Sequence, residues 1–82
     1  MLNIKVKFFA LYREVAGHPE EILDLRVGSS VGDLLGLLRE KYPKLGSLSD
    51  NIIVSVNKKY AREEVALKEG DEVALLPPVS GG

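Results

Sequence analysis

The chain has 82 residues, of which 45% are hydrophobic and 28% charged, and its formal net charge is −1. This length and composition predict one ordinary globular domain and are not those of a chain that is disordered as a whole. The charge gives no electrostatic reason to expect a nucleic acid or an anionic membrane as partner, and no apolar run approaches the roughly 18 residues of a membrane span. With no signal-peptide pattern at the start, we expect a cytoplasmic protein.

Side chains suited to catalysis are scarce. The absence of cysteine excludes disulfides, iron–sulfur ligation and thiol nucleophiles. His18 is the one histidine, and its place between Gly17 and Pro19 is typical of a solvated turn residue rather than a metal ligand. Ser80 has no histidine partner for a catalytic triad. We therefore expect no metal and no bound cofactor, and any reaction of this chain would use its backbone terminus.

The first part of the chain predicts two strands. Residues 2–9 alternate between apolar and polar side chains, as in a half-buried strand, although Phe9 is apolar on the polar face. A short helical turn is expected over 10–16, ending at Gly17 in a left-handed conformation. A second alternating strand is expected over 21–27, and antiparallel pairing with the first strand is the simplest arrangement.

A helix follows the second strand. Ser30 with Asp33 three residues later resembles a capping box, which marks the start of the helix. Pro43 ends it at or before Tyr42. Gly36, in its interior, suggests a close approach to the sheet. The apolar stripe at helical spacing is interpreted as core packing and consists of Val31, Leu34, Leu35, Leu38 and Tyr42.

The second half of the chain predicts three more strands after a loop over 44–51. Pro77 and Pro78 cannot donate to a sheet ladder, so the last strand stops near Leu76. The strands are expected over 52–57, 60–61 and 72–76, with turns at 57–59 and 68–71.

The resulting order is strand, strand, helix, strand, short strand, strand. It predicts an α+β protein with the β-grasp, or ubiquitin-like, fold: a mixed sheet of about five strands with one main helix packed on one face. In this fold the first and last strands lie side by side in the sheet centre. We expect a globular domain over 1–76 and a flexible C-terminal tail over 77–82.

The tail carries only small side chains after its prolines. Its six residues reach roughly 20 Å when extended, far enough to enter a slot in another protein while the domain stays outside. Only the carboxylate of Gly82 would then be available for chemistry. The residues expected to insert before it are Pro77, Pro78, Val79, Ser80 and Gly81. At the root of this tail, Phe9 and Leu76 are expected on the uncovered sheet face, where two adjacent apolar side chains suggest a partner surface.

These motifs together look familiar. The runs Phe8-Phe9-Ala10, Arg13-Glu14, Gly70-Asp71-Glu72-Val73-Ala74 and Pro77-Pro78-Val79-Ser80-Gly81-Gly82 resemble the small subunit of molybdopterin synthase, one of the ubiquitin-like sulfur carriers. The resemblance spans the whole chain. The Gly-Gly ending alone would fit any ubiquitin-like protein.

The resemblance implies a carrier cycle. An ATP-dependent adenylating enzyme of the ubiquitin-activating type would adenylate Gly82, and a sulfur donor would convert the adenylate to a thiocarboxylate. The tail would insert into the large synthase subunit, in a heterotetramer, and pass its sulfur to the cyclic pyranopterin precursor. The active site would lie on the large subunit, which makes this chain the non-catalytic part of a sulfurtransferase complex.

The resemblance also implies contact residues for the large subunit. Phe9 and Leu76 match positions that pack against it, although the family often has an aromatic residue in place of Leu76. Tyr60 matches a third contact position, which usually holds a smaller apolar residue. Arg13 matches a polar position near the tail root.

Three alternatives remain open at this stage. A target lysine could attack the adenylated Gly82, which would make the chain a ubiquitin-like protein modifier. A sulfur carrier of the thiamin pathway shares the fold and the Gly-Gly ending, but usually lacks the Phe-Phe-Ala start and the Pro-Pro tail. A plain β-grasp binding module would make the terminus incidental.

Overall fold

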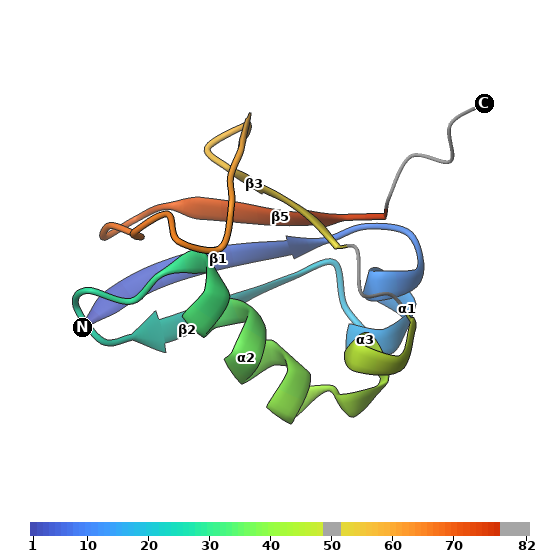
Figure 1. Cartoon of the computed structure of the whole chain (residues 1–82). Helices are drawn as coiled ribbons and strands as arrows, with labels where there is room; N and C mark the ends of the chain where they lie inside the picture. Colours follow the sequence, from blue (N-terminus) through green and yellow to red (C-terminus); the bar gives the residue numbers. More distant parts are fainter. Residues whose placement is uncertain (49–51, 78–82) are drawn as a thin grey trace.

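The protein has a five-stranded mixed sheet in the order β2-β1-β5-β3-β4, together with three helices (Figure 1). The computed structural model describes residues 1–48 and 52–77, so most of the expected tail, 78–82, lies outside the described residues. The elements are β1 (Leu2–Phe8), α1 (Leu11–Ala16), β2 (Glu20–Leu25), α2 (Val31–Lys41), α3 (Pro43–Leu48), β3 (Ile53–Val56), β4 (Lys59–Tyr60) and β5 (Glu72–Leu76).

The first and last strands form the centre of the sheet, which confirms the predicted β-grasp arrangement. β1 pairs with β5 in parallel, with Phe8 opposite Leu75, and with β2 in antiparallel orientation. β3 continues the sheet antiparallel to β5 and also pairs with the two-residue strand β4. The chain therefore leaves the sheet at Leu76 from one of its two central strands.

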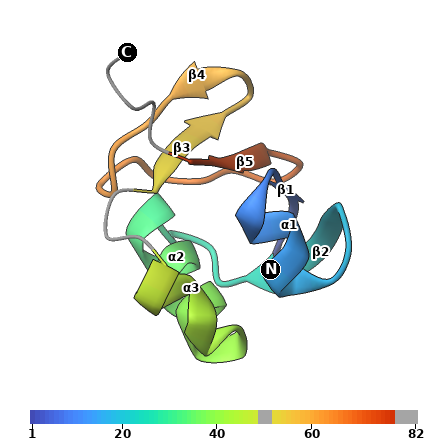
Figure 2. The same ribbon diagram turned by 90° about the vertical axis from the view of Figure 1, so that its right-hand side faces the viewer.

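Helix α2 crosses one face of the sheet (Figures 1 and 2). Its capping box is present, because the Ser30 hydroxyl accepts from the Asp33 amide and the Asp33 carboxylate accepts from the Ser30 amide. The first four residues of the predicted stripe are buried, and Tyr42 packs partly buried against them. They meet the inward-facing side chains of the strands, which include Ile4, Val6, Phe8, Val73 and Leu75.

The expected close approach at Gly36 is wrong. A Cβ atom built at Gly36 would meet nothing within 4 Å, so this glycine is on the outer side of α2. The close approach occurs one turn earlier, where the Gly32 amide donates to the Glu63 carbonyl at 2.8 Å and a Cβ would lie 3.3 Å from that oxygen. The loop before β5 thus accepts hydrogen bonds from backbone amides in the first turn of α2.

The predicted loop over 44–51 is also partly wrong, since α3 occupies its first half. Proline is favoured at the first helical position, where no amide is needed, and Pro43 begins this helix. Leu45 is fully buried in the core. A six-residue helix is too short to show a period, so its formation depends on this tertiary contact rather than on a sequence pattern.

The strand predicted over 2–9 ends one residue early, at Phe8. Ala10 has a φ of 52°, which turns the chain away from the sheet, and the Tyr12 amide donates to the Phe9 carbonyl across this turn. Helix α1 then ends at Gly17 in the predicted left-handed conformation, with a φ of 83°. In the described ranges, no helix has the length and apolarity needed to cross a membrane.

Candidate functional site

The face of the sheet turned away from α2 carries the residues that alternate with the core. In β1 the side chains of Lys5 and Lys7 point to this face, because their neighbours Ile4, Val6 and Phe8 are buried on the other. The Lys7 ammonium pairs with Glu72 on β5 at 3.4 Å. Farther along the same strands, toward the end at which Leu76 leaves the sheet, the side chains become apolar.

A depression of about 400 Å³ opens beside the point where the chain leaves the sheet, and we call it the tail-root pocket. The strand register explains it: Ile53 lies opposite Leu76, and Ser55 lies opposite Tyr60, so three strands bring these side chains together. Residues that line the tail-root pocket include Ile53, Val54, Tyr60, Arg62, Leu76 and Pro77.

The structure brings together only some of the residues predicted for the site. Tyr60, Leu76 and Pro77 share the tail-root pocket. Phe9 is 43% exposed and follows Phe8, whose partner Leu75 precedes Leu76, so it lies at the same end of the central strands. Arg13 is exposed on α1 and lines a different depression, with His18 and Pro19. Residues 78–82, including Gly82, lie outside the described residues.

Sequence reasoning missed Ile53 and Arg62 as site residues. A signal for Ile53 was present, because the turn predicted at 57–59 fixes how β3 and β4 pair and therefore which β3 residues share a face with Tyr60. Asn57 and Lys58 both adopt positive φ, as a two-residue hairpin turn requires. Nothing in the sequence pattern placed Arg62, which lies two residues beyond Tyr60, the last residue of β4.

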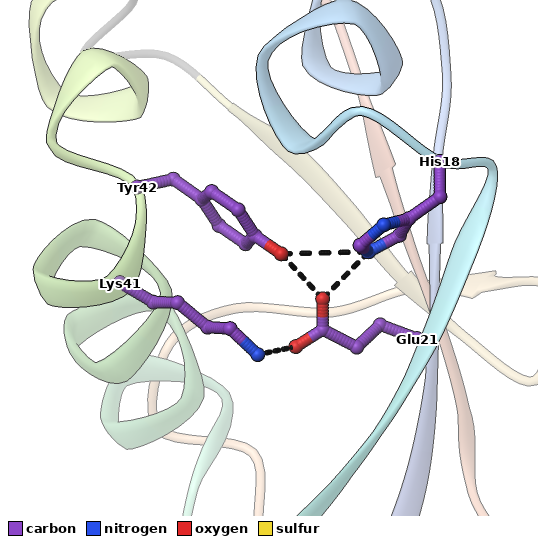
Figure 3. A network of polar contacts seen from close by, with 4 residues as sticks. All are labelled: His18, Glu21, Lys41 and Tyr42. Carbon is purple, nitrogen blue, oxygen red and sulfur yellow. Dashed lines mark hydrogen bonds and ion pairs between the residues drawn. The ribbon is translucent and has the colours of Figure 1, made fainter.

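A second cluster of functional groups lies on the helix side, around the Glu21 carboxylate (Figure 3). The carboxylate accepts from the Lys41 ammonium and the Tyr42 hydroxyl, both at the end of α2, and from His18 Nε2 at 2.7 Å. We call this set of four residues the Glu21 network. His18 is therefore a bonded, partly buried residue, which corrects its interpretation as a solvated turn residue.

The Glu21 network shifts the protonation of its members. Partial burial alone would raise the pKa of Glu21, but the bonds from Lys41, Tyr42 and His18 outweigh it and lower that pKa to about 2. Burial, together with the bond to Glu21 and its charge, raises the pKa of Tyr42 to about 12. The carboxylate is thus held as an anion and the phenol as a neutral donor. For Glu21 and Tyr42 this is the chemistry of a fixed structural contact, because both pKa values lie far from neutral pH.

The described residues present an apolar surface at the tail root. Within 1–48 and 52–77, no three histidine, cysteine, aspartate or glutamate side chains gather as a metal site would require. The tail-root pocket is lined mainly by aliphatic side chains and carries no carboxylate in its lining. A rigid β-grasp body with an apolar surface at the root of its C-terminal segment defines the class of ubiquitin-like proteins.

Comparison with known proteins identifies the family: the chain belongs to the ThiS family, whose model matches residues 6–82. The molybdopterin synthase sulfur carrier subunit of Chlamydomonas reinhardtii is 42% identical over 99% of this chain and 100% of its own length. The subunit of the same name from Mycobacterium tuberculosis is 35% identical, with both chains covered completely. These relatives place the chain among the molybdopterin synthase sulfur carrier subunits.

Solved structures share the fold over nearly the whole chain. The small archaeal modifier protein 1 of H. volcanii superimposes with a TM-score of 0.86 at 36% identity, covering 96% of this chain and 100% of the modifier. A complex of subunits 1 and 2 of molybdopterin-converting factor from Helicobacter pylori contains a chain with a TM-score of 0.71 at 24% identity. The match covers 99% of this chain and 100% of that chain. At 24% identity it shows a shared fold only.

Proposed function

We propose that the protein carries sulfur as a thiocarboxylate on Gly82 for molybdopterin synthesis. The observation that carries the proposal is the exit of the chain at Leu76 from a central strand, beside an apolar pocket that the first tail residue, Pro77, helps to line. A rigid body thus delivers the following segment to whatever protein covers this surface. The full-length likeness to sulfur carrier subunits supports the identity of the cargo.

The chemistry of the terminus determines what the carrier needs. A terminal carboxyl group has a pKa of about 3.5, so it is an anion at neutral pH and does not react with a sulfur nucleophile until a leaving group is attached. An adenylating enzyme of the ubiquitin-activating type uses ATP to form the Gly82 acyl-adenylate and releases pyrophosphate. A sulfur donor then displaces AMP and leaves the thiocarboxylate. The carrier itself binds no cofactor in this cycle.

The second partner is the large subunit of molybdopterin synthase, in a heterotetramer. It holds the active site, where the thiocarboxylate sulfur bonds to the cyclic pyranopterin precursor and water hydrolyses the bond between that sulfur and the Gly82 carbonyl carbon, which regenerates the carboxylate of Gly82. Phe9, Tyr60, Leu76 and Arg13 are the proposed contacts of the carrier body with this subunit, while 77–82 insert. We propose that this cycle takes place in the cytoplasm.

The proposal is tested by changing the terminus and nothing else. A variant with one alanine added after Gly82 should lose all sulfur transfer in a reconstituted synthase assay, while its melting temperature stays that of the unextended chain. Intact-mass measurement should show one oxygen replaced by sulfur, at Gly82, after reaction of the unextended chain with the activating enzyme, ATP and a sulfur donor. Transfer by the extended variant would show that the terminus is not the reacting group.

A second function is supported by the structural likeness to the small archaeal modifier protein 1. In this alternative, a lysine amine of a target protein attacks the same Gly82 adenylate and forms an isopeptide bond. Protein isolated from its native cells separates the two. Gly82 recovered in isopeptide linkage to lysine makes the modifier function primary, and Gly82 recovered as a thiocarboxylate makes the carrier function primary.

The ThiS match leaves the thiamin pathway as an alternative destination for the sulfur. The carrier chemistry at Gly82 is the same, and only the acceptor differs. Transfer to the pyranopterin precursor, measured against transfer to the thiazole-forming enzyme of the thiamin pathway, decides between the two acceptors.

A further inference from the structure

We propose that the tail-root pocket is a receptor site that takes one large apolar side chain, preferably aromatic, from the large synthase subunit. The inference rests on the proposed function and adds to it the direction of the contact. Phe9 and Leu76 are side chains that the carrier offers to its partner. At the pocket the direction is reversed: a side chain of the large subunit enters the carrier, next to the point where the tail of the carrier enters the large subunit.

The pocket is preformed by paired strands of the sheet. Ile53 and Val54 on β3 pair with Leu76 and Leu75 on β5, and Val54 is buried in the core. The base of the pocket therefore consists of ladder residues that do not need to move. Its volume of about 400 Å³ lies near the lower end of ligand pockets, which are roughly 300–1,000 Å³. This suits a side chain rather than a nucleotide cofactor.

Two side chains on its rim have no hydrogen-bond, ion-pair or ring partner in the part of the chain that the structure describes. Tyr60 is 80% exposed, and its side chain makes no ring contact or hydrogen bond there. The Arg62 guanidinium is exposed and has no ion pair there. Tyrosine and arginine are the residue types, with tryptophan, that most often dominate binding energy at the centre of interfaces.

The chemistry of the rim specifies the occupant. Tyr60 offers one ring face or edge, which favours an aromatic side chain over an aliphatic one. Arg62 stacks well on an aromatic ring and pairs with a carboxylate in two-pronged geometry. The partner segment should therefore carry an aromatic residue with an acidic residue close to it. Pro77 lines the same pocket, so any protein that takes up the tail also covers the pocket.

Filling the pocket tests the proposal without removing a contact. In Ile53→Trp the indole occupies the space, and affinity for the large subunit, measured by calorimetric titration with the full carrier chain, should fall at least tenfold. Ile22→Trp is the matched control, because Ile22 lies opposite Lys5 on the same sheet face but on the far strand β2. It should bind like the parent chain. Ile53→Trp with unchanged affinity would overturn the receptor site.

Two substitutions of exposed residues keep the test decisive if Ile53→Trp does not fold. Tyr60→Ala and Arg62→Ala should each weaken binding by about threefold to thirtyfold, with unchanged melting temperatures. Parental affinity in both variants would overturn the proposal. If the parent chain fails to bind the large subunit, the proposed function is wrong and the receptor site falls with it. If the parent chain binds and the pocket variants bind as tightly as it does, the proposed function stands and the receptor site does not.

Discussion

The Glu21 network and the tail-root pocket differ in whether their polar side chains have partners within the chain. In the network one carboxylate accepts from three donors, which come from the segment before β2 and from the end of α2. At the pocket, the side chains of Tyr60 and Arg62 have no hydrogen-bond, ion-pair or ring partner in the described residues, and the surface between them is apolar. Completed contacts hold the fold, and open ones are where a second protein gains most by binding.

The two regions are connected through Phe8. Its ring packs edge-on against His18, with centroids 5.9 Å apart, and against Tyr42, with centroids 6.0 Å apart. On the other side Phe8 is in register with Leu75, the residue before the tail root. The Glu21 network therefore fixes the position of α2 and of the core side of the same central strands that end at the pocket. A substitution in the network should change stability, whereas one at the pocket should change binding.

The largest effect that separates the two regions is expected on acidification. The pKa of Glu21 is about 2 in the folded chain and 4.5 in the unfolded chain, so the unfolded chain binds a proton first. The stabilisation is complete above pH 4.5 and is lost as pH falls toward 2, which amounts to about 3 kcal/mol in all. Denaturant unfolding measured between pH 7 and pH 2 should show this loss.

Glu21→Gln gives the comparison that makes the acid effect specific. The glutamine cannot ionise, so at pH 7 the unfolding free energy of the parent chain should be higher than that of Glu21→Gln. This difference should disappear as the pH falls from 4.5 to 2. Glu20→Gln removes the same charge from the neighbouring exposed position and should retain the parental pH dependence. Equal stability of Glu21→Gln and the parent chain at pH 7 would show that the network does not hold the fold. Both variants should bind the large subunit normally.

A smaller effect, on binding alone, is expected at the tail root. Phe9→Ala or Leu76→Ala should weaken affinity for the large subunit by about 1–3 kcal/mol, because each removes an apolar side chain from the proposed contact surface. Titration of the purified subunits measures this loss. Leu37→Ala is a control for the same kind of truncation, since Leu37 is exposed on α2 at the opposite face. If Leu76→Ala and Leu37→Ala bind alike, the tail-root surface is not the interface.

The sequence predicted the arrangement of the fold better than its tertiary contacts. The alternation in β1, the capping box of Ser30 and Asp33, and the prolines after Leu76 are local signals, and each element they predicted is present. The helix α3 was missed because its formation depends on burial of Leu45, a contact that no local period shows. His18 was misread although its carboxylate partner Glu21 is only three residues away, because the local sequence does not show that Tyr42, from the end of α2, joins the pair.

The candidate site likewise combines residues that the sequence predicted with residues that only the folded structure shows. Tyr60 and Leu76 were predicted from alternation and resemblance, and the structure brings them together at one pocket. Ile53 and Arg62 complete that pocket through strand register and through the chain path after β4, which are properties of the folded sheet. The role of Gly82 rests on the chemistry of the terminus and on the likeness to sulfur carriers.

The smallest expected effect is on the helix side, at Gly36. This glycine is exposed inside α2, and an added Cβ would meet nothing within 4 Å, so alanine fits without strain. Gly36→Ala should raise the unfolding free energy by up to about 1 kcal/mol, because glycine loses more backbone freedom in a helix than alanine does. Gly32→Ala is the matched comparison, because the added Cβ would lie 3.3 Å from the Glu63 carbonyl oxygen. This variant should gain less unfolding free energy than Gly36→Ala, or lose some. Because neither position lies at the tail root, thermal unfolding should separate the two variants while titration with the large subunit should not.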